Sequence, residues 1–111
     1  MENLLRDIIA PVIRNFTIEQ ITEKVSGYYD VPVEDITSPK HHKEINLARQ
    51  VSMFISRQLT SKSLKEIGKY FNRDYTTVIN ALNRIESNMI NDATLKSSIE
   101  TIIHSLKEND F

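Results

Sequence analysis

The sequence lacks cysteine, has only two glycines and contains no apolar run long enough to span a membrane. Without cysteine, the chain can form neither a disulfide framework nor a thiolate metal site. The three histidines, His41, His42 and His104, do not have a familiar zinc spacing, so we expect no metal and no other cofactor. The sequence contains no GxxxxGK[ST] nucleotide loop, and no nucleophile–base pair or carboxylate pair has a supporting context. We therefore do not expect an enzyme.

The length and the amino terminus suit a small soluble domain. The chain has 111 residues and is 40% hydrophobic, which fits one domain with a single core. The first residues, MENLLRDIIAPVIRNF, carry acids at Glu2 and Asp7 and no basic leader, so they do not resemble a signal peptide. We expect a cytoplasmic protein without a membrane partner.

The charge is distributed unevenly, although the net charge is only −1. Residues 38–84 contain nine Lys and Arg and three acids, a balance of +6, whereas the rest of the chain contains five bases and twelve acids, a balance of −7. A basic segment inside an acidic chain predicts a local surface for a polyanion. The alternative is that these charges only solvate helix surfaces.

Apolar residues recur at spacings of three and four, which predicts an all-helical fold. We expect helices over residues 3–10, 17–29, 45–60, 64–71, 75–90 and 92–107, and one or two helical turns within 31–36. The polar, basic segment 37–46 is expected to be a surface loop. Capping boxes are predicted at Thr17 with Gln20 and at Ser63 with Glu66, and Asp74 is a favourable N-cap.

A short helix, a connection of three residues and a longer helix form the pattern of a helix-turn-helix. In DNA-binding examples, the first residues of the second helix meet base edges in the major groove. Here those residues are Asp74, Tyr75, Thr76 and Thr77, preceded by Arg73. Arginine can reach phosphate or guanine, aspartate can accept from a cytosine amino group, and threonine can bond a base or pack on a thymine methyl. The same residues could instead form only a cap and a surface ion pair, and Tyr75 could be a core ring.

The residues of this unit resemble a known family. The matching positions are the pair Arg49-Gln50, the pattern Ser63-Leu64-x-x-Ile67-Gly68-x-x-Phe71, and the run Asn72-Arg73-Asp74-Tyr75-Thr76-Thr77-Val78. The family's own pattern is an arginine–glutamine pair opening a helix, then SLxxIGxxF and GGRDHTTV. From about Thr17 to Leu106, the chain is similar to the C-terminal DNA-binding domain of the bacterial replication initiator DnaA.

The resemblance implies an all-α, Trp-repressor-like fold of about six helices that binds an asymmetric, A/T-rich origin box in double-stranded DNA as a monomer. By position, Asp74, Tyr75 and Thr76 would face bases, and the loop with Lys40, His41 and Lys43 would reach the adjacent minor groove. The residues that would hold the DNA backbone are Thr77, Arg49, Gln50, Arg57 and the amide region of Ser63, Leu64 and Lys65. This division between backbone positioning and base reading is the one that DNA recognition generally uses.

The sequence departs from the family pattern at four positions. A single residue, Asn72, replaces the glycine pair, so the turn is one residue shorter, but asparagine tolerates the left-handed conformation. Tyr75 stands where the family has histidine, His41 where it has the minor-groove arginine, and Ala48 where it has proline. A narrow A/T minor groove favours a fixed cation, whereas histidine is mostly neutral at neutral pH. We expect DNA binding to persist with an altered sequence preference.

The resemblance also suggests a division of the chain. Residues 1–16 would be a linker helix and connection, and residues 17–111 the DNA-binding domain. The family's ATPase module would be a partner if the chain is part of a longer initiator, although a free-standing domain also fits. Two other functions stay open: a helix-turn-helix transcription regulator or divergent paralogue, and a helical protein-interaction module without a DNA role. We place the protein in the bacterial cytoplasm, with the nucleoid.

Overall fold

The computed structural model describes residues 16–108, which form six helices and no strand. The helices are α2 (Ile18–Tyr29), α3 (Val33–Ile36), α4 (Lys43–Leu59), α5 (Leu64–Tyr70), α6 (Tyr75–Asn91) and α7 (Ala93–Glu108). The all-α prediction is confirmed over this range. The helix expected at residues 3–10 lies outside the described residues.

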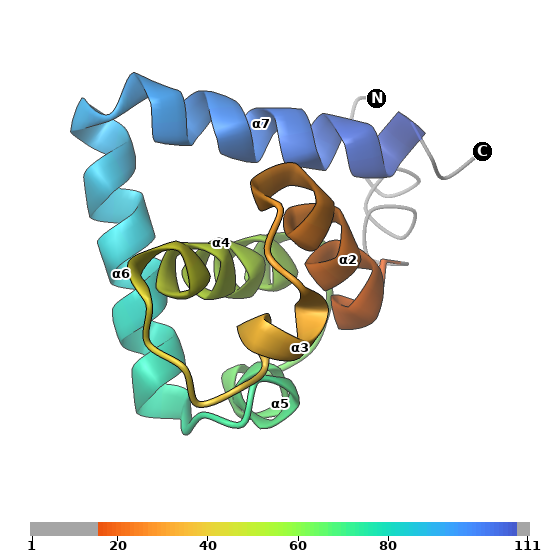
Figure 1. The fold of residues 1–111 in the computed structure, drawn as a ribbon, viewed down its shortest axis with the longest axis vertical. Helices are drawn as coiled ribbons and strands as arrows, with labels where there is room; N and C mark the ends of the chain where they lie inside the picture. Colours follow the sequence, from red (N-terminus) through yellow and green to blue (C-terminus); the bar gives the residue numbers. More distant parts are fainter. Residues whose placement is uncertain (1–15, 109–111) are drawn as a thin grey trace, which may run out of the picture.

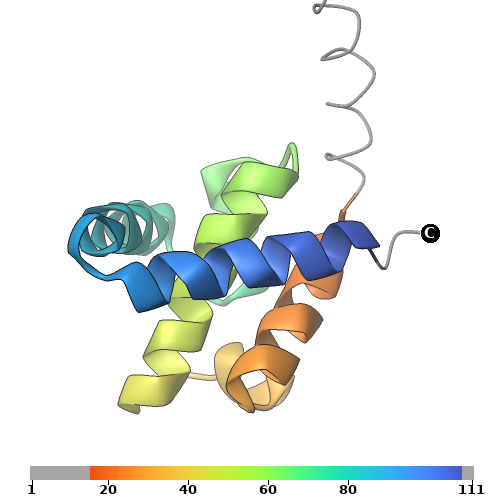
Figure 2. The same ribbon diagram turned by 90° about the horizontal axis from the view of Figure 1, so that it is seen from above.

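Helix α4 is the centre of the fold, because it contacts each of the other five helices. Helix α6 runs along one side of it, and α5 lies below, next to the start of α6 (Figure 1). Seen from above, α7 lies across α2 and α4, both of which it contacts (Figure 2). The start of α6, the start of α4 and the loop before α4 consequently share one corner of the molecule, away from α7.

The core takes side chains from every one of these helices, as the predicted apolar stripes require. The largest completely enclosed side chains include Phe71, Ile21, Ile36, Ile55, Ile85 and Ile99. Burying a side chain of this size contributes roughly 1.5–3 kcal/mol, so the core fixes how the helices are oriented. Phe16 is also buried, one residue before the expected start of the domain.

Both predicted capping boxes are present. At α2, the Gln20 N–H donates to Thr17 Oγ1 over 3.0 Å, and the Thr17 N–H donates to Gln20 Oε1 over 2.9 Å. At α5, the Glu66 N–H donates to Ser63 Oγ over 3.1 Å, and the Ser63 N–H donates to Glu66 Oε1 over 2.8 Å. The hydrogen bond from the Ser63 N–H lowers the pKa of Glu66. These caps set where both helices begin.

Two helix starts differ from the prediction. Helix α4 begins at Lys43 rather than residue 45, because the Asn46 N–H donates to the His42 carbonyl over 2.8 Å and closes an earlier turn. The loop before α4 is therefore limited to residues 37–42. Helix α7 begins one residue later than predicted, since Asp92 is its cap and its Oδ1 accepts from the Leu95 N–H over 3.0 Å. Within residues 16–108, no helix is long and apolar enough to cross a membrane.

Candidate nucleic-acid interface

The turn between α5 and α6 is closed by two backbone hydrogen bonds. The Arg73 N–H donates to the Gly68 carbonyl over 2.8 Å, and the Asn72 N–H donates to the Lys69 carbonyl over 3.1 Å. Asn72 has φ of 59°, so it adopts the left-handed conformation that this pattern requires after a helix. The prediction that asparagine preserves the shortened turn is confirmed.

The same turn passes very close to α5. A Cβ atom built on Gly68 would lie 2.5 Å from the Arg73 carbonyl oxygen and 3.3 Å from Val78 Cγ2. No side chain fits that distance without moving the backbone, so a glycine is required here. Gly68 therefore fixes the approach of the turn to α5, and with it the direction in which α6 begins.

The start of α6 presents a polar, exposed surface. Asp74 caps the helix, since its Oδ1 accepts from the Thr77 N–H and from the Thr77 hydroxyl, each over 2.9 Å. These two hydrogen bonds, the one from the backbone first, lower the pKa of the Asp74 carboxyl. Thr76 and Thr77 are exposed, and Tyr75 is 48% exposed. Tyr75 is therefore not a core ring, and the helix start is free to meet a partner.

The structure places Arg49 differently from the expected DNA-backbone contact. Its side chain is only 4% exposed, and its donors are used inside the protein. Nε donates to the Ile36 carbonyl over 2.7 Å, and Nη1 donates to Asn46 Oδ1 over 2.8 Å. Nη2 donates to the carbonyls of Asp35, Ser38 and Lys40 over 3.1, 2.8 and 3.0 Å. The guanidinium therefore holds the backbone of α3 and of the loop before α4.

Arg73 and Asn72 hold the same loop from the opposite side. Arg73 Nη2 donates to the Ser38 carbonyl over 3.0 Å, while its Nη1 donates to the Phe71 carbonyl over 2.9 Å. Asn72 Nδ2 donates to the Thr37 carbonyl over 3.1 Å. Arg73 was expected to reach phosphate or guanine, but its guanidinium is half-buried and bonded to carbonyls.

The two guanidinium groups create a positive corner. Burial, and after it the charge of Arg73, lowers the pKa of Arg49 to about 10, so Arg49 stays charged at neutral pH. Within residues 16–108, Lys40 forms an ion pair with Asp35 at 3.0 Å, and His104 Nε2 lies 3.0 Å from Glu108 Oε2. Neither pair places a carboxylate against Arg49 or Arg73. An anion entering this corner would meet two charges that no acid of the described part neutralises.

A hollow of about 220 Å³ opens between the loop, α4 and the start of α6. We call it the basic hollow; it is lined by His41, Asn46, Arg49, Gln50, Met53, Arg73 and Thr77. Five of these seven residues were predicted from the sequence to contact DNA. The hollow therefore joins the predicted minor-groove loop to the predicted recognition helix.

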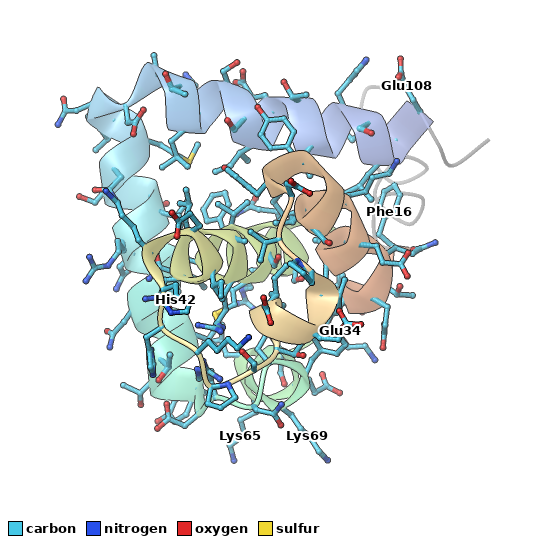
Figure 3. The ribbon with its side chains drawn as sticks, in the orientation of Figure 1. Phe16, Glu34, His42, Lys65, Lys69 and Glu108 are labelled. Atoms are coloured by element: carbon cyan, nitrogen blue, oxygen red, sulfur yellow. The ribbon has the colours of Figure 1, made fainter. Side chains whose placement is uncertain are left out.

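The other predicted residues lie around the basic hollow without lining it. Lys40 and Lys43 are exposed on the loop and at the start of α4, and Arg57 is exposed near the end of α4. Ser63 and Lys65 are exposed at the start of α5, where Leu64 is half-buried. Lys65 and Lys69 project from α5 on the outer side of the fold (Figure 3).

Sequence reasoning missed four residues. Lys69 follows Lys65 by four residues, which places both on one face of α5, and Lys62 lies just before the Ser63 cap; this cluster could have been read from the sequence. Asn46 and Ser38, which bind Arg49, gave no comparable signal because their contacts depend on the tertiary structure.

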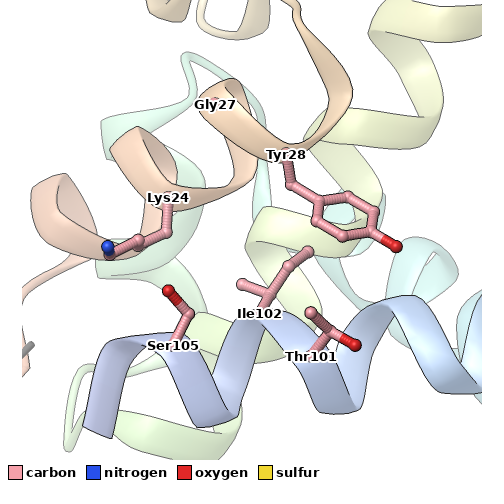
Figure 4. Close-up of a pocket in the computed structure, with 6 residues that line it drawn as sticks. All are labelled: Lys24, Gly27, Tyr28, Thr101, Ile102 and Ser105. Carbon is pink, nitrogen blue, oxygen red and sulfur yellow. The ribbon is translucent and has the colours of Figure 1, made fainter. Parts of the chain in front are cut away.

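Two further hollows lie elsewhere. One, of about 250 Å³, lies between α2 and α7, with Lys24, Gly27 and Tyr28 facing Thr101, Ile102 and Ser105 (Figure 4). We call it the α2–α7 groove. The other, of about 430 Å³, lies between the start of α2 and α5. Among residues 16–108, no three His, Asp or Glu side chains are grouped to hold a metal ion.

Comparison with known proteins agrees with this geometry. The family profile described as "Bacterial dnaA protein helix-turn-helix" matches residues 18–85. The chromosomal replication initiator protein DnaA of Ruegeria pomeroyi is 37% identical over 107 residues, which cover 96% of this chain and 23% of that protein. The same protein of Caldanaerobacter subterraneus subsp. tengcongensis is 37% identical over 106 residues, 96% of this chain and 24% of its own length.

A solved structure is similar as well. The crystal structure of a DNA replication initiation factor superposes with a TM-score of 0.75 at 34% identity, over 97% of this chain and 32% of that one. The chain spans about a quarter of the length of the curated relatives it matches. The match over residues 18–85 contains α5, the turn and most of α6, so it includes the helix-turn-helix described above. The chain belongs to the family of bacterial DnaA helix-turn-helix domains.

Proposed function

We propose that this chain binds double-stranded DNA sequence-selectively at origin boxes, as the DNA-binding domain of a DnaA-type replication initiator. The observation that carries the proposal is the basic hollow, because it lies between the exposed start of α6 and the loop at residues 37–42. A protein that reads a major groove and the adjacent minor groove must straddle the sugar–phosphate backbone between them. The basic hollow has the position and the charge for that backbone.

Backbone contacts in this arrangement come from several directions. Gln50 lines the basic hollow and offers its side-chain amide to a phosphate, in the field of Arg49 and Arg73. Thr77 also lines it, and its hydroxyl, which donates to Asp74 Oδ1, would have to turn to the phosphate instead. Arg57 and Lys43 are exposed on the flanks. At the start of α5, first-turn N–H groups such as those of Leu64 and Lys65 are suited to a phosphate, and Lys65 adds a charge. These contacts set the register of the protein on DNA without reading its sequence.

Base reading falls to the first turn of α6. Tyr75 and Thr76 are exposed there and reach into a major groove that can hold a helix. Both hydrogen bonds to Asp74 use Oδ1, so Oδ2 can accept from a cytosine amino group. His41 and Lys40 lie on the loop that meets the minor groove. Because tyrosine and histidine replace a histidine and an arginine of the family pattern, we propose a box that differs from the family's at these positions.

A DnaA-type initiator has other activities besides DNA binding, and we assign these to a separate module. The chain corresponds to the helix-turn-helix family rather than to an ATPase module, so we propose that it binds DNA and leaves ATP-driven unwinding to a partner module. Residues 1–16 would connect the two, and residues 17–111 would form the DNA-binding unit. We propose that it acts as a monomer on one asymmetric box, in the cytoplasm and on the nucleoid.

Fluorescence anisotropy tests the proposal. The chain is titrated onto a duplex with a DnaA-type box and onto a scrambled duplex across a salt series. We expect at least about tenfold preference for the box, equal to roughly 1.4 kcal/mol, and an affinity for both duplexes that falls as salt rises. A matched pair of variants separates the roles: Thr76→Ala removes the preference, and Arg57→Ala weakens both duplexes alike.

The other functions predict different results. A transcription regulator that reads paired half-sites would bind as a dimer, which analytical ultracentrifugation on the duplex detects. Equal, salt-sensitive binding to both duplexes would show a DNA-binding domain with a different code. Absence of binding at low salt would overturn the DNA-binding proposal and favour a protein-interaction module.

A further inference from the structure

We propose that Arg49, Arg73 and Asn72 are positioning residues that fasten the loop at residues 37–42 to the helix-turn-helix turn, so that the loop and α6 act as one rigid reading unit. The proposal rests on the proposed function, since it assigns the two elements to neighbouring grooves. It replaces direct phosphate binding as the main role of both arginines.

Arg49 holds the inner side of the loop. Its side chain is nearly enclosed, and its donors bond Asn46 Oδ1 and four backbone carbonyls, those of Asp35, Ile36, Ser38 and Lys40. A guanidinium that reached out to a phosphate would have to give up these hydrogen bonds. Because a buried carbonyl such as that of Ile36 is costly to leave unpaired, the arrangement keeps Arg49 on α3 and the loop.

The Ser38 carbonyl links the two sides. It accepts from Arg49 Nη2 over 2.8 Å and from Arg73 Nη2 over 3.0 Å, so a side chain of α4 and one of the turn meet on a single oxygen. The two guanidinium charges are brought together there, and the Arg73 charge contributes to the lowered pKa of Arg49. A shared acceptor ties the loop to the turn at a fixed distance.

Asn72 adds a second tie, one that depends on the shortened turn. Its left-handed backbone closes the turn, and its Nδ2 donates to the Thr37 carbonyl over 3.1 Å. Glycine also adopts the left-handed conformation but has no side chain to donate. Asn72 therefore combines a backbone role that glycine can fill with a contact to the loop that glycine cannot make.

The consequence concerns how the box is read. A free loop must be ordered when it enters a groove, and that ordering opposes binding, whereas a loop already fixed avoids this cost. Fixing the loop on the turn also sets its distance from α6, so a base change under the loop cannot be accommodated by moving the loop alone. Selectivity at the loop end of the box then depends on residues that need not touch DNA.

The test uses the full chain with three variants, Arg49→Lys, Arg73→Lys and Asn72→Gly, and the control Arg84→Lys, at an exposed position of α6 outside the proposed DNA contacts. The lysine variants keep the charge but lose the planar fork that bonds several carbonyls at once. Two measurements are made. Amide hydrogen exchange in the free protein follows the Ser38 and Lys40 N–H groups, which are hydrogen-bonded in the loop. Anisotropy compares the box duplex with duplexes substituted at the loop end or at the α6 end.

We expect faster exchange at Ser38 and Lys40 in all three variants, and at least about fivefold loss of discrimination at the loop end with discrimination at the α6 end retained. The salt dependence stays that of the wild type, and Arg84→Lys changes none of these quantities. If Arg49→Lys does not fold, Arg73→Lys and Asn72→Gly decide the outcome.

Three results would overturn the proposal. The first is wild-type exchange at both amides in Arg73→Lys and Asn72→Gly. The second is an equal loss of affinity on every duplex, which indicates phosphate contacts. The third is loop-end discrimination retained while exchange accelerates. If the wild type itself prefers no box, the proposed function fails, but the exchange measurement still decides whether the loop is fastened.

Discussion

The basic hollow and the α2–α7 groove have nearly the same volume, about 220 and 250 Å³, yet their surroundings differ completely. The basic hollow lies beside a turn in which Gly68 has no room for a methyl group, and two arginines bond backbone carbonyls there. In the α2–α7 groove, a Cβ on Gly27 would meet nothing within 4 Å. Size therefore does not distinguish the two hollows. The basic hollow is charged and lies against a backbone turn without free space, whereas the α2–α7 groove has room for an added side chain at Gly27.

The largest expected effect comes from filling the space at Gly68. Gly68→Ala places a methyl group against the Arg73 carbonyl, so the turn must move away from α5. We expect a loss of about 1–3 kcal/mol in the free energy of unfolding, or more, measured by urea denaturation, together with loss of box preference in anisotropy. A variant with wild-type stability and wild-type box preference would show that the turn does not depend on this close approach.

The second effect compares two tyrosines of similar exposure, Tyr75 at 48% and Tyr28 at 46%. Tyr75→Ala removes a side chain from the first turn of α6, and we expect the discrimination between box and scrambled duplex to fall by about 1–3 kcal/mol. Tyr28→Ala changes the α2–α7 groove and should leave both affinities unchanged in the same titration. Equal losses in the two variants would remove the functional contrast between the start of α6 and the α2–α7 groove.

The third effect concerns the cap of α6 and its pH dependence. Asp74→Ala removes the acceptor of two hydrogen bonds, and we expect the melting temperature at neutral pH to fall by roughly 5 °C. Because folding lowers the pKa of Asp74 from its ordinary value of 3.8, its charge stabilises the fold above that pH. This contribution is lost as the pH falls through the lower pKa of the folded state.

Asp74→Asn and Thr17→Ala are the controls for this third effect. Asp74→Asn keeps a capping acceptor but has no charge. Its melting temperature should approach that of the wild type below about pH 4, because the wild-type carboxylate then loses its charge. Thr17→Ala weakens a cap of α2 whose side chain carries no charge. The difference in melting temperature between this variant and the wild type should therefore not depend on the titration of Asp74. A difference for Asp74→Asn that stays constant across this range would rule out a role for the carboxylate charge.

The smallest effect is a gain. Gly27→Ala adds a methyl group to α2 where nothing obstructs it, and alanine favours the helix over glycine. We expect the free energy of unfolding to rise by about 0.5–1 kcal/mol in urea denaturation, with DNA binding unchanged. A loss of stability would mean that the α2–α7 groove is as constrained as the turn at Gly68.

The sequence predicted local features well, because they depend on neighbouring residues. The capping boxes at Thr17 and Ser63, the cap at Asp74 and the left-handed Asn72 are all decided within a few positions. The start of α4 was placed two residues late, since polar residues at a helix start resemble a loop. The family pattern supplied the helix-turn-helix, which spacing alone left open to a helical hairpin.

The sequence could not predict which acceptors the side chains of Arg49 and Arg73 bond. Arg49 was assigned to the DNA backbone by its position in the family pattern, and Arg73 because an arginine before a recognition helix can reach phosphate or guanine. The carbonyls that Arg49 bonds, in α3 and the loop, lie 9 to 14 residues before it, and the loop carbonyl that Arg73 bonds lies 35 residues before it. Backbone carbonyls are present at every residue, so no spacing of side chains marks the ones that an arginine will bind.

The separation of charge along the chain becomes a separation in space. The basic segment 38–84 contains the loop, α4, α5 and the start of α6 (Figure 1). The other described residues hold nine acids and three lysines, spread over α2, α3, the end of α6, α7 and the residues that join them. Such a molecule has an electric dipole although its net charge is close to zero. In the field of a duplex it experiences a torque that turns the basic corner forward before contact. Productive encounters then become more frequent at low ionic strength, without strong attraction to every polyanion.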